Sequence, residues 1–177
     1  MTHRVGAINA QLPQGVRTRL GIPAAVDSDA VVGLQDVMPT ILEASGLEPP
    51  TSVGGRSVLP ALADPTGDWR AAIHGEHSAC YDRRCEMQYL TDGRQKYIWL
   101  AHDGSEQLFD LTIDPYEEHD LAADPDHHDE RDRWRAQLVA ILIARGCGWV
   151  QDGQLVPRGD GPPLVSPHYA DDSDGTE

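Results

Sequence analysis

The 177-residue chain, of 19.3 kDa, is long enough for one ordinary domain and too short for two large ones. Asp and Glu outnumber Lys and Arg by 29 to 14, and a formal charge of -15 repels nucleic acid and anionic membranes, so we expect neither as a partner. The chain shows no secretory signal or membrane-spanning run, and its three cysteines do not suit a secreted disulfide framework. These features predict a cytoplasmic protein.

The first strongly patterned element is a helix over residues 36–45, preceded by a stretch without clear periodicity that we do not expect to fold alone. Pro39 falls in the first turn, where its missing N–H costs little, and Gly46 suits a left-handed stop. The apolar residues of this helix recur at intervals of three and four. They are Leu34, Val37, Met38, Ile41 and Leu42.

From Trp69 onward the apolar period changes to two, which predicts strands near residues 70–77, 87–91, 94–100 and 106–111. Asp92-Gly93 predicts a two-residue hairpin between the second and third strands, and Asp103-Gly104 predicts a turn into the fourth. Strands joined in this way form a four-stranded antiparallel meander. One face of such a sheet needs a cover, usually a helix.

Two helix starts are predicted after the strands, each an aspartate followed by a proline. Asp114-Pro115 precedes Glu117 as in a capping box, and Asp124-Pro125 opens a helix that Gly146 ends. This second helix, over residues 125–145, carries the stripe that we expect to cover the sheet: Trp134, Leu138, Ile141 and Leu142. The sequence therefore predicts an α+β fold, followed by a flexible acidic tail over residues 147–177.

Several blocks of this sequence resemble the C-terminal portion of type I sulfatases, the arylsulfatase family. The run Glu106–Leu111, followed by Asp114-Pro115, Glu117, Asp120-Leu121 and Asp124-Pro125, is similar to the signature near the C-terminus of those enzymes. Gln35–Leu47 and Gly54–Leu62 are similar to two earlier family segments, in the same order. Weaker matches are Trp69-Arg70, Gly75–His77 and Gly93–Ile98.

The resemblance implies the end of an alkaline-phosphatase-like sulfatase fold. Residues 1–65 would be a remnant of the α/β domain, and residues 66–146 the C-terminal subdomain, with its antiparallel sheet and covering helix. Partners would be the missing catalytic domain, or a second copy bound through the 36–45 helix.

The catalytic groups of that family do not occur in this sequence. Family members use a formylglycine made within Cys-x-Pro-x-Arg or Ser-x-Pro-x-Arg, beside calcium held by Asp and Asn. None of the three cysteines, Cys80, Cys85 and Cys147, begins such a motif, and Asn9 is the single asparagine. We therefore expect a sulfatase fragment, a sulfuric ester hydrolase by resemblance, that carries no cofactor and is inactive alone. The alternatives are a free-standing binding module derived from the subdomain, or a small zinc protein.

One cluster of residues could carry chemistry. His74, His77, Cys80 and Cys85 have the residue types and local spacing of a zinc site, although strand alternation sends His74 and His77 to opposite faces. A disulfide between the two cysteines is a further alternative, beside free thiols. If the strand approaches the active-site mouth, as the resemblance implies, His74, Glu76 and His77 are candidates for the rim of the substrate site. The simpler interpretation is a solvated strand end.

Overall fold

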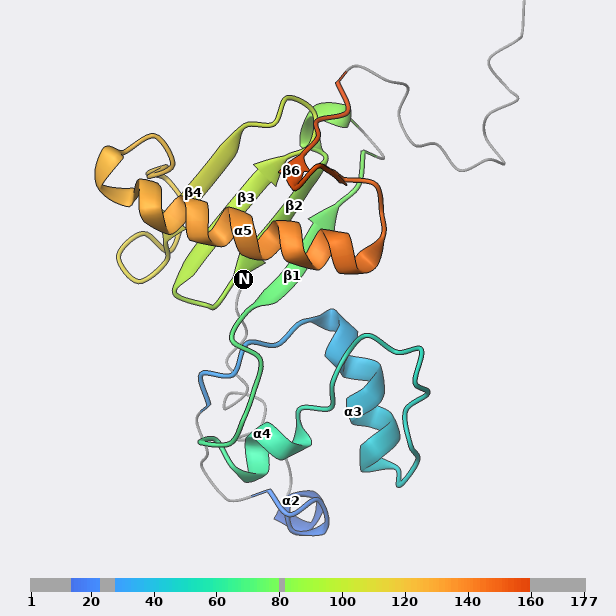
Figure 1. The fold of residues 1–177 in the computed structure, drawn as a ribbon. Coiled ribbons are helices and arrows are strands. Elements are labelled where there is room, and N and C mark those ends of the chain that lie inside the picture. Colours follow the sequence, from blue (N-terminus) through green and yellow to red (C-terminus); the bar gives the residue numbers. More distant parts are fainter. Residues whose placement is uncertain (1–13, 23–27, 80–81, 160–177) are drawn as a thin grey trace, which may run out of the picture. The chain divides into compact units, whose positions relative to one another are not determined.

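The computed structural model describes residues 14–22, 28–79 and 82–159, and the chain divides into two compact units, Met1–Ile73 and His74–Glu177 (Figure 1). Sequence patterns place the boundary earlier, at residue 66. The linking stretch is tied to the first unit by two polar contacts. The Trp69 indole N–H donates to the Val31 carbonyl at 2.8 Å, and the Arg70 guanidinium pairs with Asp36 at 2.6 Å.

The N-terminal unit contains α2 (Gln14–Arg19), α3 (Val37–Ala44) and α4 (Leu59–Ala63), with a 3-10 turn, Leu34–Asp36, leading into α3. A small core of Ile22 and Leu62 holds these pieces together. The predicted helix over residues 36–45 corresponds to this turn and α3, and Gly46 follows with the expected positive φ, 75°. Apolar side chains packed around the core are Leu20, Ala30, Val32, Val58 and Leu59.

Asp36 is the polar centre of this unit and is only 2% exposed. Its carboxylate accepts from the backbone N–H groups of Gly33 and Arg56, both at 2.9 Å, and from Arg70. A buried carboxylate with several donors remains satisfied, whereas an unpaired one would be costly. Gly55 permits this close approach, because a Cβ there would lie 1.8 Å from the Gln35 carbonyl oxygen.

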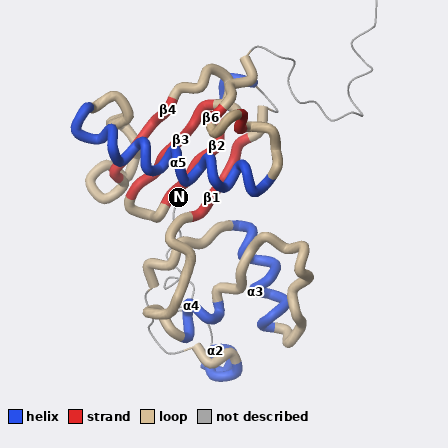
Figure 2. Tube along the Cα trace, viewed as in Figure 1, coloured by secondary structure: helices blue, strands red, loops and turns tan. Residues whose placement is uncertain are grey.

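The C-terminal unit is built on the predicted meander, a sheet in the order β1-β2-β3-β4 (Figure 2). Its strands are β1 (Ile73–His77), β2 (Met87–Thr91), β3 (Gln95–Leu100) and β4 (Glu106–Asp110). Leu90 pairs with Tyr97 and Thr91 with Lys96, so the β2–β3 turn is centred on Gly93 and Arg94, one residue beyond the predicted pair. The reason is Asp92, whose carboxylate accepts from the next two N–H groups after Gly93, at 2.8 Å each.

One helix, α5 (His128–Arg145), lies across one face of this sheet, as the sequence predicts (Figure 1). Trp134, Leu138 and Leu142 are each at most 1% exposed. The sheet offers them a matching apolar surface, since Leu90, Tyr97 and Leu108 share one face through strand pairing and are completely buried. Asp124 caps the 3-10 turn Pro125–His127 that leads into α5, and Gly146 ends the helix with a φ of 63°.

Polar contacts fix the position of α5 along the sheet. Glu106 of β4 accepts from the Tyr97 hydroxyl and from both the Nε and NH2 groups of Arg135. Burial raises the pKa of Glu106, but the hydrogen bonds from Arg135 and Tyr97 outweigh it and leave the pKa below its ordinary value. The Trp134 indole N–H donates to the Gln95 side chain at 3.0 Å. Complementary apolar and polar contacts thus select one placement of the helix.

The predicted helix start at Asp114-Pro115 is wrong. Residues 111–120 form turns, and Glu117 has a φ of 60°, which is incompatible with a helix interior. The Asp114 carboxylate accepts from the N–H groups of Glu118 and His119, so it closes a turn. The segment then protects the edge of β4, because the Leu121 N–H donates to the Leu108 carbonyl at 2.8 Å.

The expected flexible tail over residues 147–177 differs from the structure in its first part. Residues Val150–Gln151 (β5) and Gln154–Leu155 (β6) form a short hairpin, while residues 160–177 lie outside the described ranges. Trp149 is 5% exposed and makes an edge-to-face contact with Trp99, with ring centroids 5.5 Å apart. The Arg158 guanidinium stacks 3.4 Å from the centre of the Trp149 ring. Aromatic burial therefore orders this segment.

Among the helices of the described residues, none combines the length and apolar character needed to cross a membrane.

Truncating Leu138 should destabilise the C-terminal unit strongly. Leu138 of α5 is fully buried against the sheet, so Leu138→Ala should lower the free energy of unfolding by about 2 to 5 kcal/mol, as for other buried leucines. Ile143→Ala is the matched control in the same helix, because Ile143 is 58% exposed and should cost far less. Urea denaturation followed by circular dichroism measures both. Equal midpoints for Leu138→Ala and the unsubstituted chain would contradict this placement of the core.

Candidate functional site

Two of the three candidate residues of β1, His74 and Glu76, lie in a ring of polar side chains beside the end of α5. His74 Nε2 lies 2.9 Å from the Gln88 side-chain oxygen, and Nδ1 lies 3.2 Å from NH1 of Arg145. Arg145 also donates to both carboxylate oxygens of Glu76, at 3.1 and 3.3 Å. Gln88, His74, Arg145 and Glu76 together make up this polar ring.

Strand alternation and the helix terminus bring these groups together. His74 and Glu76 are two residues apart on β1 and therefore share a face, which is also that of Gln88. Arg145 is the last residue of α5, where a cation complements the negative end of the helix dipole. Gln88 is 2% exposed, whereas Glu76 and Arg145 are about half exposed. The ring therefore has a buried end and a solvated end.

The electrostatics of the ring favour a neutral imidazole beside an ion pair. Burial lowers the pKa of His74 and the charge of Arg145 lowers it further, against the opposing effects of the Gln88 hydrogen bond and the Glu76 charge. The hydrogen bond from Arg145 holds the pKa of Glu76 below its usual value, and the same bond raises the pKa of Arg145. Glu76 is thus a poor proton acceptor, and His74 already uses both ring nitrogens.

His77, the third rim candidate, points away from this ring by strand alternation. Its Nδ1 atom is inaccessible to solvent and has no hydrogen-bond partner within the described part of the chain. The polar ring that contains His74 and the imidazole of His77 therefore lie on opposite sides of β1 and are separate features.

The zinc alternative is not favoured. Within the described ranges, which exclude Cys80, the ligand atoms of His74, His77 and Cys85 do not come together as a metal-binding group. Both nitrogens of His74 are engaged in the polar ring. Cys85 is exposed and free, so the structure does not show the alternative disulfide to Cys80.

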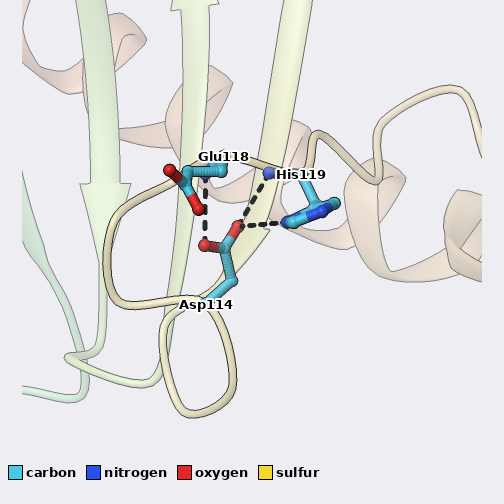
Figure 3. Close-up of side chains that lie close together, drawn as sticks. All are labelled: Asp114, Glu118 and His119. Carbon is cyan, nitrogen blue, oxygen red and sulfur yellow. Dashed lines mark hydrogen bonds and ion pairs between the residues drawn. The ribbon is translucent and has the colours of Figure 1, made fainter.

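A different trio, which the sequence did not single out, gathers at the turn after β4. Ligand atoms of Asp114, Glu118 and His119 lie within 4.8 Å of one another (Figure 3). The Asp114 carboxylate already accepts from the backbone N–H groups of Glu118 and His119, at 3.2 and 2.8 Å, and lies 3.6 Å from the His119 ring. Calcium prefers six or more oxygen ligands, so this trio does not fit the family's calcium site. We therefore interpret these contacts as hydrogen bonds that stabilise the turn after β4.

Because no group of the described residues fits a calcium or zinc site, we expect added metal to have no effect on stability. Millimolar calcium or stoichiometric zinc should leave the melting temperature unchanged, because tight binding to the folded state alone would raise it. Differential scanning calorimetry after chelator treatment, with Asp114→Asn as a control for the trio, tests this. A metal-dependent increase that Asp114→Asn abolishes would show that the turn is a binding site.

Comparison with known proteins agrees with this architecture. A family model described as N-sulphoglucosamine sulphohydrolase, C-terminal, matches residues 9–143. An arylsulfatase of Clostridium perfringens is 33% identical over 128 residues, which are 72% of this chain and 26% of that protein. Arylsulfatase K of Mus musculus is 32% identical over 113 residues, or 59% of this chain and 20% of that protein.

Solved structures with the same fold include a substrate complex and a hydrolase. The protein BT4656, in complex with its substrate D-glucosamine-2-N,6-O-disulfate, superposes on this chain with a TM-score of 0.63 at 20% identity. The match covers 72% of this chain and 27% of that one. A phosphonate monoester hydrolase from Silicibacter pomeroyi gives a TM-score of 0.51 at 28% identity, over 62% of this chain and 24% of that one.

The meander, its covering helix and these matches define the C-terminal portion of a sulfatase with an alkaline-phosphatase-like fold. The chain belongs to the family of N-sulphoglucosamine sulphohydrolase C-terminal domains. It spans about a quarter of the length of the curated relatives that it matches. The sulfatase resemblance of the sequence blocks is confirmed, and the zinc-protein and free-standing-module alternatives are not favoured.

Sequence reasoning identified two members of the polar ring and missed Gln88 and Arg145. Arg145 carried a usable signal, since it directly precedes the Gly146 stop at a helix terminus. Its partners are 69 and 71 residues away in the sequence, so no local pattern pairs them. Gln88 is a polar residue on the inward face of β2, a position that demands a buried partner.

Proposed function

We propose that this chain acts as the C-terminal part of a sulfuric ester hydrolase and has no sulfatase activity by itself. The observation that carries the proposal is the family match over residues 9–143 in a chain that spans about a quarter of its curated relatives. The formylglycine motif is missing from the sequence, and no group of the described residues fits the calcium site. In a completed enzyme, both would come from the remaining catalytic part.

We further propose that α3 and the turn before it form the docking face for that catalytic part. Leu34 is 92% exposed, and Ile41 is 60% exposed. Side chains of this size are normally covered when they cluster on one short segment. The other members of this exposed face are Val37 and Met38, each about half exposed, and Leu47 just beyond the helix end is also exposed. Without the catalytic part, the same face would support self-association.

We assign the rim of the substrate site in the completed enzyme to β1, with His74, Glu76 and His77 as its candidate residues. The ring gives two of them different roles. Glu76 is half exposed and can contact solvent or ligand, while His74 holds the guanidinium of Arg145 in place. The guanidinium of Arg145 is paired with Glu76 at the solvated end, and its planar set of donors would suit an anionic sulfate ester.

A direct assay tests the lack of activity. The purified chain, incubated with an aryl sulfate and calcium, should give no turnover above buffer, because its sequence has no formylglycine motif and its described residues offer no fitting calcium site. A sulfatase preparation in the same buffer serves as the positive control. Turnover that co-purifies with the chain through successive columns would refute the proposal.

The exposed face of α3 predicts dye binding and self-association. The double variant Leu34→Ser with Ile41→Ser should reduce both while preserving the melting temperature, since neither side chain is buried. Ile113→Ser is the matched control, because Ile113 is 81% exposed but lies in the C-terminal unit. Dye fluorescence and analytical ultracentrifugation are the measurements. A monodisperse unsubstituted chain without a dye signal would argue against the docking face.

A further inference from the structure

The polar ring fixes the tautomer of His74. Arg145 has donors and no acceptor, so His74 Nδ1, 3.2 Å from NH1, must be the unprotonated nitrogen that accepts. The proton of the neutral ring is then on Nε2, which donates to the Gln88 oxygen at 2.9 Å. The Glu76 carboxylate can only accept, and it accepts from Arg145 at 3.1 and 3.3 Å. Each member of the ring thus has one compatible hydrogen-bonding role.

Protonation of His74 would break this arrangement at one atom. A second proton on the imidazole must occupy Nδ1, the acceptor of the Arg145 hydrogen bond. An imidazolium there would place a donor and a positive charge against the guanidinium. Glu76 would still attract Arg145, but from the half-exposed end of the ring, where solvent weakens an ion pair.

We propose that the ring of Gln88, His74, Arg145 and Glu76 is a proton-operated latch that holds the last turn of α5 against β1 and β2 and releases it on acidification. The latch connects elements that are otherwise distant in sequence, since Arg145 is 71 residues beyond His74. The state of the latch depends on one titratable atom, Nδ1 of His74. This inference is independent of the proposed sulfatase role.

The charged and titratable groups around His74 determine the direction of the pH effect. Glu76 on β1 and Arg145 on α5 face the ring, β2 contributes the neutral Gln88, and Cys147 lies near Arg145 beyond the helix end. The pKa of His74 is lowered from 6.5 in the folded chain, chiefly by burial. The contribution of the neutral His74 to the stability of the latch is therefore complete above pH 6.5. It is lost as the pH falls through the lower pKa that His74 has in the folded chain.

Nuclear magnetic resonance tests the latch in the full chain. Nitrogen shifts of His74 near neutral pH should show the Nε2–H tautomer. Amide exchange in the last turn of α5, compared with that of Leu138, should accelerate several-fold between about pH 8 and about pH 5, after correction for intrinsic rates. An Nδ1–H tautomer, or a last turn whose relative protection does not change with pH, would overturn the proposal.

Two variants separate the latch from general acid destabilisation. His74→Gln keeps an oxygen that can accept from Arg145 but cannot titrate, so its last turn should show the same relative protection at both pH values. Arg84→Gln removes an exposed arginine outside the ring and should retain the full pH response. A pH response in His74→Gln as large as that of the unsubstituted chain would exclude His74 as the control point.

Discussion

The C-terminal unit depends on the burial of one sheet face beneath α5. A four-stranded meander without cover would expose Leu90, Tyr97 and Leu108 on that face, and an isolated helix of α5's composition would have little reason to form. Each element therefore stabilises the other. The charged contact between Arg135 and Glu106 adds direction to this apolar interaction, because it is satisfied at only one position of the helix along the strands.

The same helix relates the fold to the candidate site. Its middle supplies Leu138 to the core, while its last residue supplies Arg145 to the polar ring on β1. The geometry of the ring therefore depends on how well the apolar stripe is packed. The N-terminal unit follows a different logic, in which the buried carboxylate of Asp36 collects donors from three separate segments.

Much of this fold was predictable because local signals agreed with the tertiary structure. Alternating apolar residues indicated the strands, and Asp124 and Gly146 delimited α5. The errors arose where one motif serves two structures: Asp114-Pro115 suits a helix start and also a closed turn, and the positive φ of Glu117 decides for the turn. For the site, the sequence indicated His74 and Glu76. Their partners depend on the packing of α5, which residue types alone do not encode.

The hairpin after α5 has a practical consequence for defining this domain. Trp149 covers Trp99, and the N–H groups of Arg158 and Gly159 donate to the carbonyls of Ala101 and His102 at 2.8 and 3.0 Å. A recombinant version that stops at the helix-ending Gly146 would thus uncover an indole and leave two backbone acceptors to solvent. A version made for expression or crystallisation should therefore include the residues up to Gly159, because an acidic, Gly- and Pro-rich composition is a poor guide to where a domain ends.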